Sequence, residues 1–236
     1  MKISGFQGFS LLDYPNRISF VIFTQGCNFR CPFCHNPELI STRKKGIYSE
    51  EYILEELNRR RKLVSSVVIT GGEPTLQKDL PQFLFKLKKR RLSIKLDTNG
   101  SNPHMLVELI QAKLVDYVAI DFKNSKEKYA KTIGLKENLA EKYYKNLLES
   151  LRILKKFDIK FEVRTTLVPE LVEERDLAII KEIIGDVPYY LQQFNPEKAL
   201  SLEYRLKKPY SLEEALDLKE KVNGKLRGII NSSQNK

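Results

Sequence analysis

The sequence is poor in cysteine, and the few cysteines that it has are not spread along the chain. Its 236 residues contain three, all of them between positions 27 and 34. An odd number excludes a framework in which every cysteine is paired in a disulfide. A structural zinc site needs four ligands, usually with a second Cys or His pair further along the chain. The three cysteines therefore favour another kind of metal or redox site.

Long apolar segments are absent as well. Residues 1–17 contain no apolar core of a secretory signal, and the best apolar run, residues 18–23, is far too short to cross a bilayer. No internal repeat, low-complexity tract or Pro/Gly-rich linker divides the chain. We therefore expect a cytoplasmic protein, in which thiols stay reduced.

The charge is strongly basic, with a formal net charge of +11. Two basic runs, residues 59–62 and 86–91, end predicted helices, where cations stabilise the helix dipole. In a β/α layout these helix ends lie on the face opposite the strands' carboxyl ends, so we interpret the runs as solvated surface and not as a nucleic-acid site. The run at residues 43–45 follows the cysteines and is placed to contact a partner.

Short β-rich runs alternate with longer helical patterns along the chain. Strands are predicted over residues 18–24, 67–70, 93–97, 117–121, 160–166 and 189–194. Helices are predicted over residues 49–61, 79–90, 139–156 and 173–184, and from residues 102 and 211 onward. This alternation predicts an α/β fold with parallel strands and right-handed crossovers, either a doubly wound open sheet or a full or partial (β/α) barrel.

Polar or glycine-rich residues lie at or near the ends of all six predicted strands. They are Cys27, Cys31 and Cys34; Gly71, Gly72 and Glu73; Asp97 and Thr98; Asp121 and Lys123; Arg164; and Gln193. In both candidate architectures the carboxyl ends of the strands carry the chemistry. The sequence therefore predicts one site built from six segments.

The cysteines have the spacing C-x3-C-x2-C, with Phe33 before the last one. This pattern resembles the signature of the radical S-adenosylmethionine (radical SAM) superfamily. The resemblance implies that Cys27, Cys31 and Cys34 hold a [4Fe–4S] cluster whose fourth iron binds S-adenosylmethionine. One-electron reduction of this cofactor then gives a 5′-deoxyadenosyl radical.

The stretch Gly71-Gly72-Glu73-Pro74, directly after a predicted strand, resembles the second motif of the same family. The resemblance implies that the two glycines allow a close backbone approach to the cofactor. It also implies that the Glu73 carboxylate meets the methionyl ammonium.

Further stretches resemble the glycyl-radical-enzyme activating enzymes of this family. They are residues 8–17 with Asp13, residues 34–36, residues 97–100 and residues 121–123. The resemblance implies a partial (β/α)6 TIM-like barrel with a parallel sheet. It also implies a single domain over residues 1–230, with residues 1–17 packed on the barrel and a frayed tail over residues 231–236.

The resemblance also implies roles for individual residues. Lys123 pairs with the methionyl carboxylate, Arg164 reaches the cofactor, and Gln193 lies near the adenosine. Asp97, Thr98 and Asp121 lie where some activating enzymes hold a monovalent cation, and Asp13 faces the incoming glycine loop. Simpler roles exist for several of them: Asp97 and Asp121 as caps of turns, and Arg164 as an ion-pair partner.

The closest resemblance is to the activating proteins of anaerobic ribonucleoside-triphosphate reductase. This predicts a radical SAM oxidoreductase that makes a glycyl radical on that enzyme, with a low-potential donor such as flavodoxin or ferredoxin. Three alternatives stay open. The first is an activating enzyme of pyruvate formate-lyase or a related enzyme, and the second is a radical SAM enzyme acting on a nucleoside precursor or RNA. The third is a zinc-binding interaction protein using the cysteines and His35. No membrane partner is expected.

Overall fold

The structure is a computed structural model that describes residues 1–228, so the predicted tail over residues 231–236 lies outside the described residues. The chain forms two compact units. The first unit contains Met1–Asn28, Glu38–Ala119 and Asn146–Lys160. The second contains Phe29–Pro37, Ile120–Lys145 and the chain from Phe161 onward. The single-domain organisation expected from the sequence stays a prediction.

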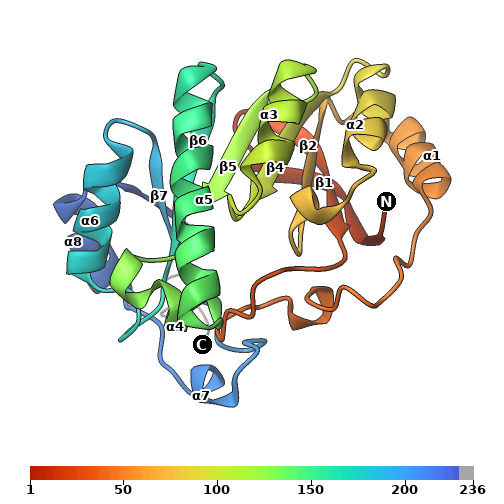
Figure 1. The fold of residues 1–236 in the computed structure, drawn as a ribbon. Helices are drawn as coiled ribbons and strands as arrows, with labels where there is room; N and C mark the ends of the chain where they lie inside the picture. The colour runs from red at the N-terminus through yellow and green to blue at the C-terminus, as the bar shows by residue number, and fades with distance from the viewer. Residues whose placement is uncertain (229–236) are drawn as a thin grey trace. The chain divides into compact units, whose positions relative to one another are not determined.

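The first unit is built on β1 (Ile3–Tyr14), β2 (Arg17–Thr24), β3 (Ser66–Gly71), β4 (Ser93–Thr98) and the first residues of β5 (Tyr117–Asp121). β1 is antiparallel to β2, and β2, β3 and β4 are parallel. Helices α1 (Glu50–Arg60), α2 (Leu80–Lys88) and α3 (Pro103–Gln111) form a row along one face of these strands (Figure 1). Residues 146–156 of α5 (Glu137–Lys156) also belong to this unit.

Local sequence explains these elements. Val67, Val68 and Ile69 are completely buried, as expected for a parallel strand covered on both faces. The Ser49 side chain accepts a hydrogen bond from the Tyr52 amide and caps α1, and Asn102 caps α3 in the same way. The predicted helix starts at Ser49 and Asn102 are thus confirmed.

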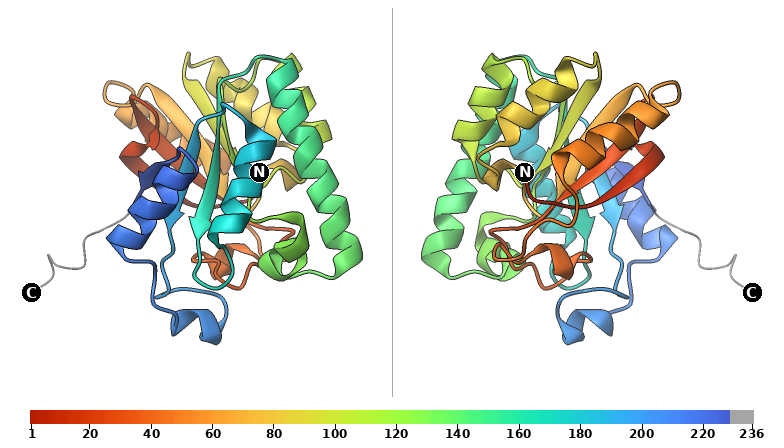
Figure 2. Two further views of the ribbon diagram at one scale, coloured as in Figure 1. Left: turned by 90° about the vertical axis from the view of Figure 1, so that its left-hand side faces the viewer. Right: turned by 90° about the vertical axis from the view of Figure 1, so that its right-hand side faces the viewer.

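The second unit contains the parallel strands β6 (Phe161–Leu167), β7 (Tyr189–Gln193) and β8 (Lys225–Arg227), together with the end of β5. Its helices are α4 (Tyr129–Ile133), α6 (Glu174–Ile184), α7 (Leu202–Arg205) and α8 (Leu212–Lys221). Figure 2 shows α6 and α8 side by side. Short 3-10 turns complete the described chain at Pro37–Leu39, Pro74–Leu76 and Lys126–Lys128.

The α/β class predicted from the sequence is confirmed, and each predicted strand and helix is present within a few residues of its expected bounds. Two strands were not predicted, β1 and β8. β1 mixes Gly and Ser with its apolar residues and is interrupted by register shifts, whereas β8 has only three residues. No helix among residues 1–228 combines the length and apolar character needed to span a membrane.

Candidate functional site

The glycine turn after β3 lies against the start of the cysteine loop, within the first unit. Gly71 has a φ of +115°, and a Cβ added to it would lie 2.3 Å from the Thr24 nitrogen. A Cβ on Gly72 would lie 2.2 Å from the Gly26 carbonyl oxygen. Both positions therefore need glycine, because another stretch of backbone occupies the space of a side chain. In the structure, the close approach that these glycines permit is between two segments of the protein.

Glu73 is the centre of a buried hydrogen-bond network at this end of the first unit. Its side chain is fully buried and accepts four hydrogen bonds. The donors are the Thr75 amide (3.1 Å), the Thr75 hydroxyl (2.6 Å), the Thr98 hydroxyl (2.7 Å) and the Asn99 amide (2.7 Å). Burial raises the pKa of Glu73, and the hydrogen bonds offset only part of that rise. The carboxylate thus joins the turn after β3 to the turn after β4.

The same network reaches the cysteine loop through asparagine side chains. Asn99 Nδ2 donates to Asn28 Oδ1 at 3.0 Å, and Asn28 Nδ2 donates to Ser101 Oγ at 2.9 Å. Asn28 directly follows Cys27, whose amide donates to the Ile40 carbonyl at 3.0 Å. The carboxyl ends of β2, β3 and β4 are therefore tied together through Asn28, a residue that was not predicted to take part in the site.

Asp97 and Asp13, two further predicted site residues of the first unit, both contact Lys95. Lys95 Nζ lies 2.8 Å from Asp97 Oδ1 and also donates to the Asp13 carbonyl at 2.7 Å. The Asp13 side chain accepts a hydrogen bond from the Ser10 hydroxyl at 2.5 Å. Asp13 lies near the hairpin between β1 and β2, at the end of β2 opposite Cys27. Its role toward a glycine loop stays a prediction.

The rest of the cysteine loop belongs to the second unit, where backbone contacts hold it. The Cys34 amide donates to the Cys31 carbonyl at 3.0 Å, and the Arg30 amide donates to the Ile133 carbonyl at 2.8 Å. Gly134, with a φ of +64°, ends α4 so close to this loop that a Cβ on it would lie 2.2 Å from the Arg30 oxygen. Cys31 and Phe33 are buried.

An ion-pair triad lies in the second unit, between the end of β5 and the middle of β6. Asp121 lies between two cations, with Lys123 Nζ at 2.9 Å and Arg164 Nε at 2.8 Å. Burial alone would raise the pKa of Asp121, but the two cations lower it well below its ordinary range. The triad contains one carboxylate and two cations, so its groups carry one excess positive charge.

Gln193 and an unexpected ion pair also lie in the second unit. Gln193 Nε2 donates to the Tyr210 carbonyl at 3.2 Å, whereas its Oε1 is buried and has no hydrogen-bond partner among the described residues. The fully buried Glu162 accepts hydrogen bonds from both terminal nitrogens of Arg227, at 2.7 and 3.1 Å. Sequence reasoning missed this pair. One feature of the sequence could have identified Glu162: it precedes Arg164 by two residues, so both side chains lie on the same face of β6.

The thiolates of Cys27, Cys31 and Cys34 are suitable ligands for a multinuclear iron–sulfur cluster. Within residues 1–228, no three Cys, His, Asp or Glu side chains form a group that could hold a metal ion. A four-iron cluster binds each thiolate at a separate iron and does not need them to converge on one point. Three thiolates within eight residues therefore fit such a cluster, with one iron left for another ligand.

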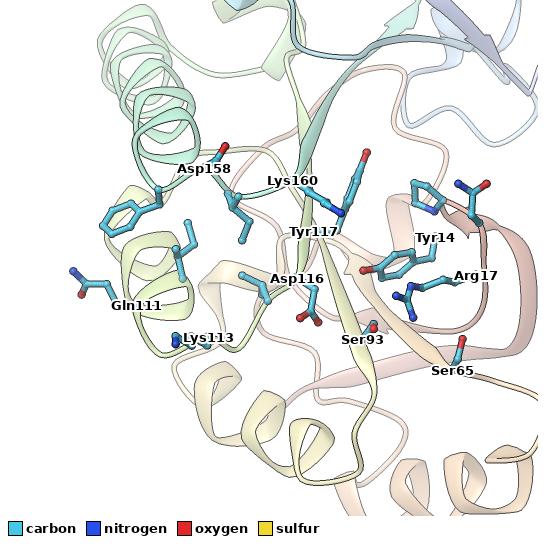
Figure 3. A pocket seen from close by; sticks show the side chains of 16 residues that line it. Tyr14, Arg17, Ser65, Ser93, Gln111, Lys113, Asp116, Tyr117, Asp158 and Lys160 are labelled. Atoms are coloured by element: carbon cyan, nitrogen blue, oxygen red, sulfur yellow. The ribbon is translucent and has the colours of Figure 1, made fainter.

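The first unit has a large hollow that does not coincide with these residues. It is a cleft of about 1250 Å³ near the amino ends of β3, β4 and β5. Figure 3 shows Tyr14, Arg17, Asp116 and Tyr117 around it. None of the predicted site residues lines it, so it is not the candidate site.

The comparisons with known proteins agree on the family to which this chain is similar. The model of the radical SAM superfamily matches residues 21–183. A protein of Methanocaldococcus jannaschii, whose name assigns it to the glycyl-radical enzyme activating enzymes, is 38% identical over 205 residues, covering 86% of this chain and 84% of its own length. The pyruvate formate-lyase-activating enzyme of Clostridium pasteurianum is 28% identical over 224 residues, covering 87% and 89%.

A solved structure shows the same fold. SuiB of Streptococcus suis, bound to S-adenosylmethionine, has a TM-score of 0.67 at 16% identity, over 88% of this chain and 49% of SuiB. Together with the family match, this confirms the predicted fold class, a partial TIM-like barrel of the α/β type.

Proposed function

Because the chain belongs to the radical SAM superfamily, and within it to the glycyl-radical-enzyme activating enzymes, we propose that it generates the glycyl radical of an anaerobic ribonucleoside-triphosphate reductase. Membership in this family makes the chain an enzyme, which removes the alternative of a zinc-binding interaction protein. The family also implies the [4Fe–4S] cluster and S-adenosylmethionine. In the proposal, Cys27, Cys31 and Cys34 hold the cluster.

The ion-pair triad is the observation that carries the cofactor assignment. Lys123 and Arg164 both contact the carboxylate of Asp121 in a largely buried position, so two cations converge on one carboxylate. Two neighbouring cations in a site with little solvent attract an anion. The methionyl carboxylate of S-adenosylmethionine is such an anion, and the buried Gln193 Oε1 is an acceptor that suits the amino group of its adenine.

Other residues act by shaping the site. Glu73 is surrounded by donors and holds the turns that carry Gly71, Gly72 and Thr98, so its proposed role is to position these turns. A monovalent cation is not part of the proposal, because Asp97 is paired with Lys95 and Asp121 with two cations. When bound, the cluster held by Cys27, Cys31 and Cys34 and its cofactor would supply the radical chemistry needed to abstract a hydrogen atom from the partner's glycine.

The identity of the partner rests on sequence resemblance in residues 5–39. The likeness to the Clostridium pasteurianum protein makes pyruvate formate-lyase the second candidate partner. A small low-potential protein such as flavodoxin or ferredoxin supplies the electron. We place the reaction in the cytoplasm, where the three thiols stay reduced.

Electron paramagnetic resonance tests the proposal directly. The anaerobically reconstituted enzyme, with S-adenosylmethionine and a chemical reductant, is mixed separately with the reductase and with pyruvate formate-lyase. We expect a glycyl-radical signal with the reductase. A signal with pyruvate formate-lyase alone would move the assignment to that enzyme, and no signal with either would refute both.

Cys31→Ala is the matching test of the cluster. Without this thiolate the [4Fe–4S] cluster loses one of its three protein ligands, and we expect no 5′-deoxyadenosine above background. The product is measured by chromatography after anaerobic incubation. A Cys31→Ala variant that still forms 5′-deoxyadenosine at the wild-type rate would show that this thiol is not a cluster ligand.

A further inference from the structure

One segment of the second unit is bonded directly to the cysteine loop and is also exposed. It comprises residues 195–210 around α7, and we call it the α7 loop. Its Ser201 amide donates to the carbonyl of Pro32 at 2.9 Å, and Pro32 directly follows Cys31. Figures 1 and 2 show α7 at the outer end of a loop that extends away from β7 and α8. The α7 loop therefore connects the surface of this unit to its cluster-binding segment.

Buried anchors fix the α7 loop in place. Ala199 and Tyr204 are buried, and Arg205 Nε donates to the Ala199 carbonyl at 2.7 Å. Lys207 Nζ forms an ion pair with Glu170 at 2.6 Å, outside the loop, and lies over the Tyr204 ring. The loop is thus held by packing, a hydrogen bond and an ion pair, and it presents a defined surface.

That surface is apolar at its centre. Leu202 is 72% exposed and Leu206 is 88% exposed. Residues four apart on a helical turn lie on the same face, so the two side chains form one exposed apolar pair. Single exposed leucines are ordinary, but two highly exposed leucines side by side on a fixed turn favour an interaction site.

The surroundings of this pair are basic. Lys198, Arg205 and Lys208 are exposed. The α7 loop contains four basic residues, of which Lys207 is paired with Glu170, and two acidic ones, Glu197 and Glu203. The exposed charge of the loop is therefore positive on balance and complements an acidic surface.

We propose that the α7 loop is the docking surface for the acidic, low-potential electron-transfer protein that reduces this enzyme. The inference rests on the proposed function. Interfaces between redox partners are small and transient, and charge complementarity speeds their encounter. An apolar pair with a basic rim fits such a partner, and the Ser201–Pro32 hydrogen bond places it next to the segment that receives the electron. The donor is oxidised by one electron and the enzyme is reduced by one, with no transfer of a group or proton.

The test compares two reductants on the same reconstituted enzyme. In one arm a reduced flavodoxin supplies the electron, and in the other dithionite, a small reductant that needs no docking surface. The rate of 5′-deoxyadenosine formation is measured for the wild type, for Leu206→Asp and for Lys208→Glu. Leu63→Asp, at a 63% exposed leucine in the first unit, and Lys156→Glu, at the end of α5, are the matched controls.

We expect Leu206→Asp to lower the flavodoxin-driven rate at least about tenfold, as for the loss of an interface hot spot. Lys208→Glu is expected to lower it about two- to fivefold and to weaken its dependence on ionic strength. The dithionite-driven rate of both variants, and both rates of the control variants, should stay at wild-type values.

Three results would overturn the docking proposal. The first is an equal loss in both arms, because the leucine would then act on the fold or the cluster. The second is no loss in either arm. The third is a loss of the partner's glycyl signal while 5′-deoxyadenosine formation is normal in both arms, because the surface would then bind the glycyl radical enzyme. Failure of the proposed function is seen separately, since the wild type would then form no 5′-deoxyadenosine even with dithionite.

Discussion

Glu73 in the first unit is a fully buried carboxylate and Asp121 in the second is a partly buried one, and their partners differ in kind. Glu73 accepts hydrogen bonds from four uncharged donors, and its pKa is raised by burial. Asp121 lies between Lys123 and Arg164, which lower its pKa against the effect of burial. Both residues were assigned to the cofactor from the sequence, yet their surroundings support different tasks.

The two carboxylates differ in the groups that they hold together. The donors around Glu73 come from the turn that it begins and from the turn after β4, so the carboxylate organises backbone. Asp121 instead lies between two cations that come from different segments, Lys123 and Arg164. The first arrangement is a structural device, whereas the second brings charged groups together, as the proposed binding of an anion requires.

The strongest test of the structural device is Glu73→Ala. It leaves the buried donors of Thr75, Thr98 and Asn99 without acceptors, and each such group costs about 1–3 kcal/mol. We expect a loss of at least about 4 kcal/mol in the free energy of unfolding, measured by urea denaturation. Glu73→Gln, which retains one acceptor oxygen, serves as the control and should lose less. Equal stability of the alanine variant and the wild type would show that the network contributes nothing to the fold.

The second test concerns the ion-pair triad. Asp121→Asn removes the carboxylate that both Lys123 and Arg164 contact, and we expect a loss of about 2–4 kcal/mol in the free energy of unfolding, because removing one partner of a largely buried ion pair is strongly destabilising. Lys123→Met should cost less, since Arg164 still neutralises Asp121. The double variant should be more stable than Asp121→Asn alone. A double variant that shows the two losses added together would contradict the charge argument.

These residues also show what the sequence could and could not predict. Apolar runs such as residues 67–69 and caps such as Ser49 are local signals, and the elements that they predict are present. The role of Glu73 depends on Thr98 and Asn99, which are more than twenty residues away and become neighbours only through the pairing of β3 with β4. The Glu162–Arg227 pair is separated by 65 residues, and no motif marks it. The motifs therefore predict which segments form the site, whereas the partner of each polar group depends on tertiary structure.

The smallest expected effect is a difference in pH dependence between the two carboxylates. The pKa of Glu73 is raised in the folded state, so its favourable contribution is present below its unfolded pKa and is lost as the pH rises through the folded value. The pKa of Asp121 is lowered, so its contribution is present above the unfolded pKa and is lost as the pH falls through the folded value. The stability advantage of the wild type over Glu73→Gln should therefore shrink from pH 4 toward pH 8, by at most about 1.4 kcal/mol per pH unit. Its advantage over Asp121→Asn should instead shrink on acidification below about pH 4, near the ordinary pKa of an aspartate.

Urea denaturation across both ranges measures the two slopes. Slopes of the same sign would mean that the two carboxylates do not differ in the way their partners indicate, and the division between a structural and a charge-neutralising role would fail.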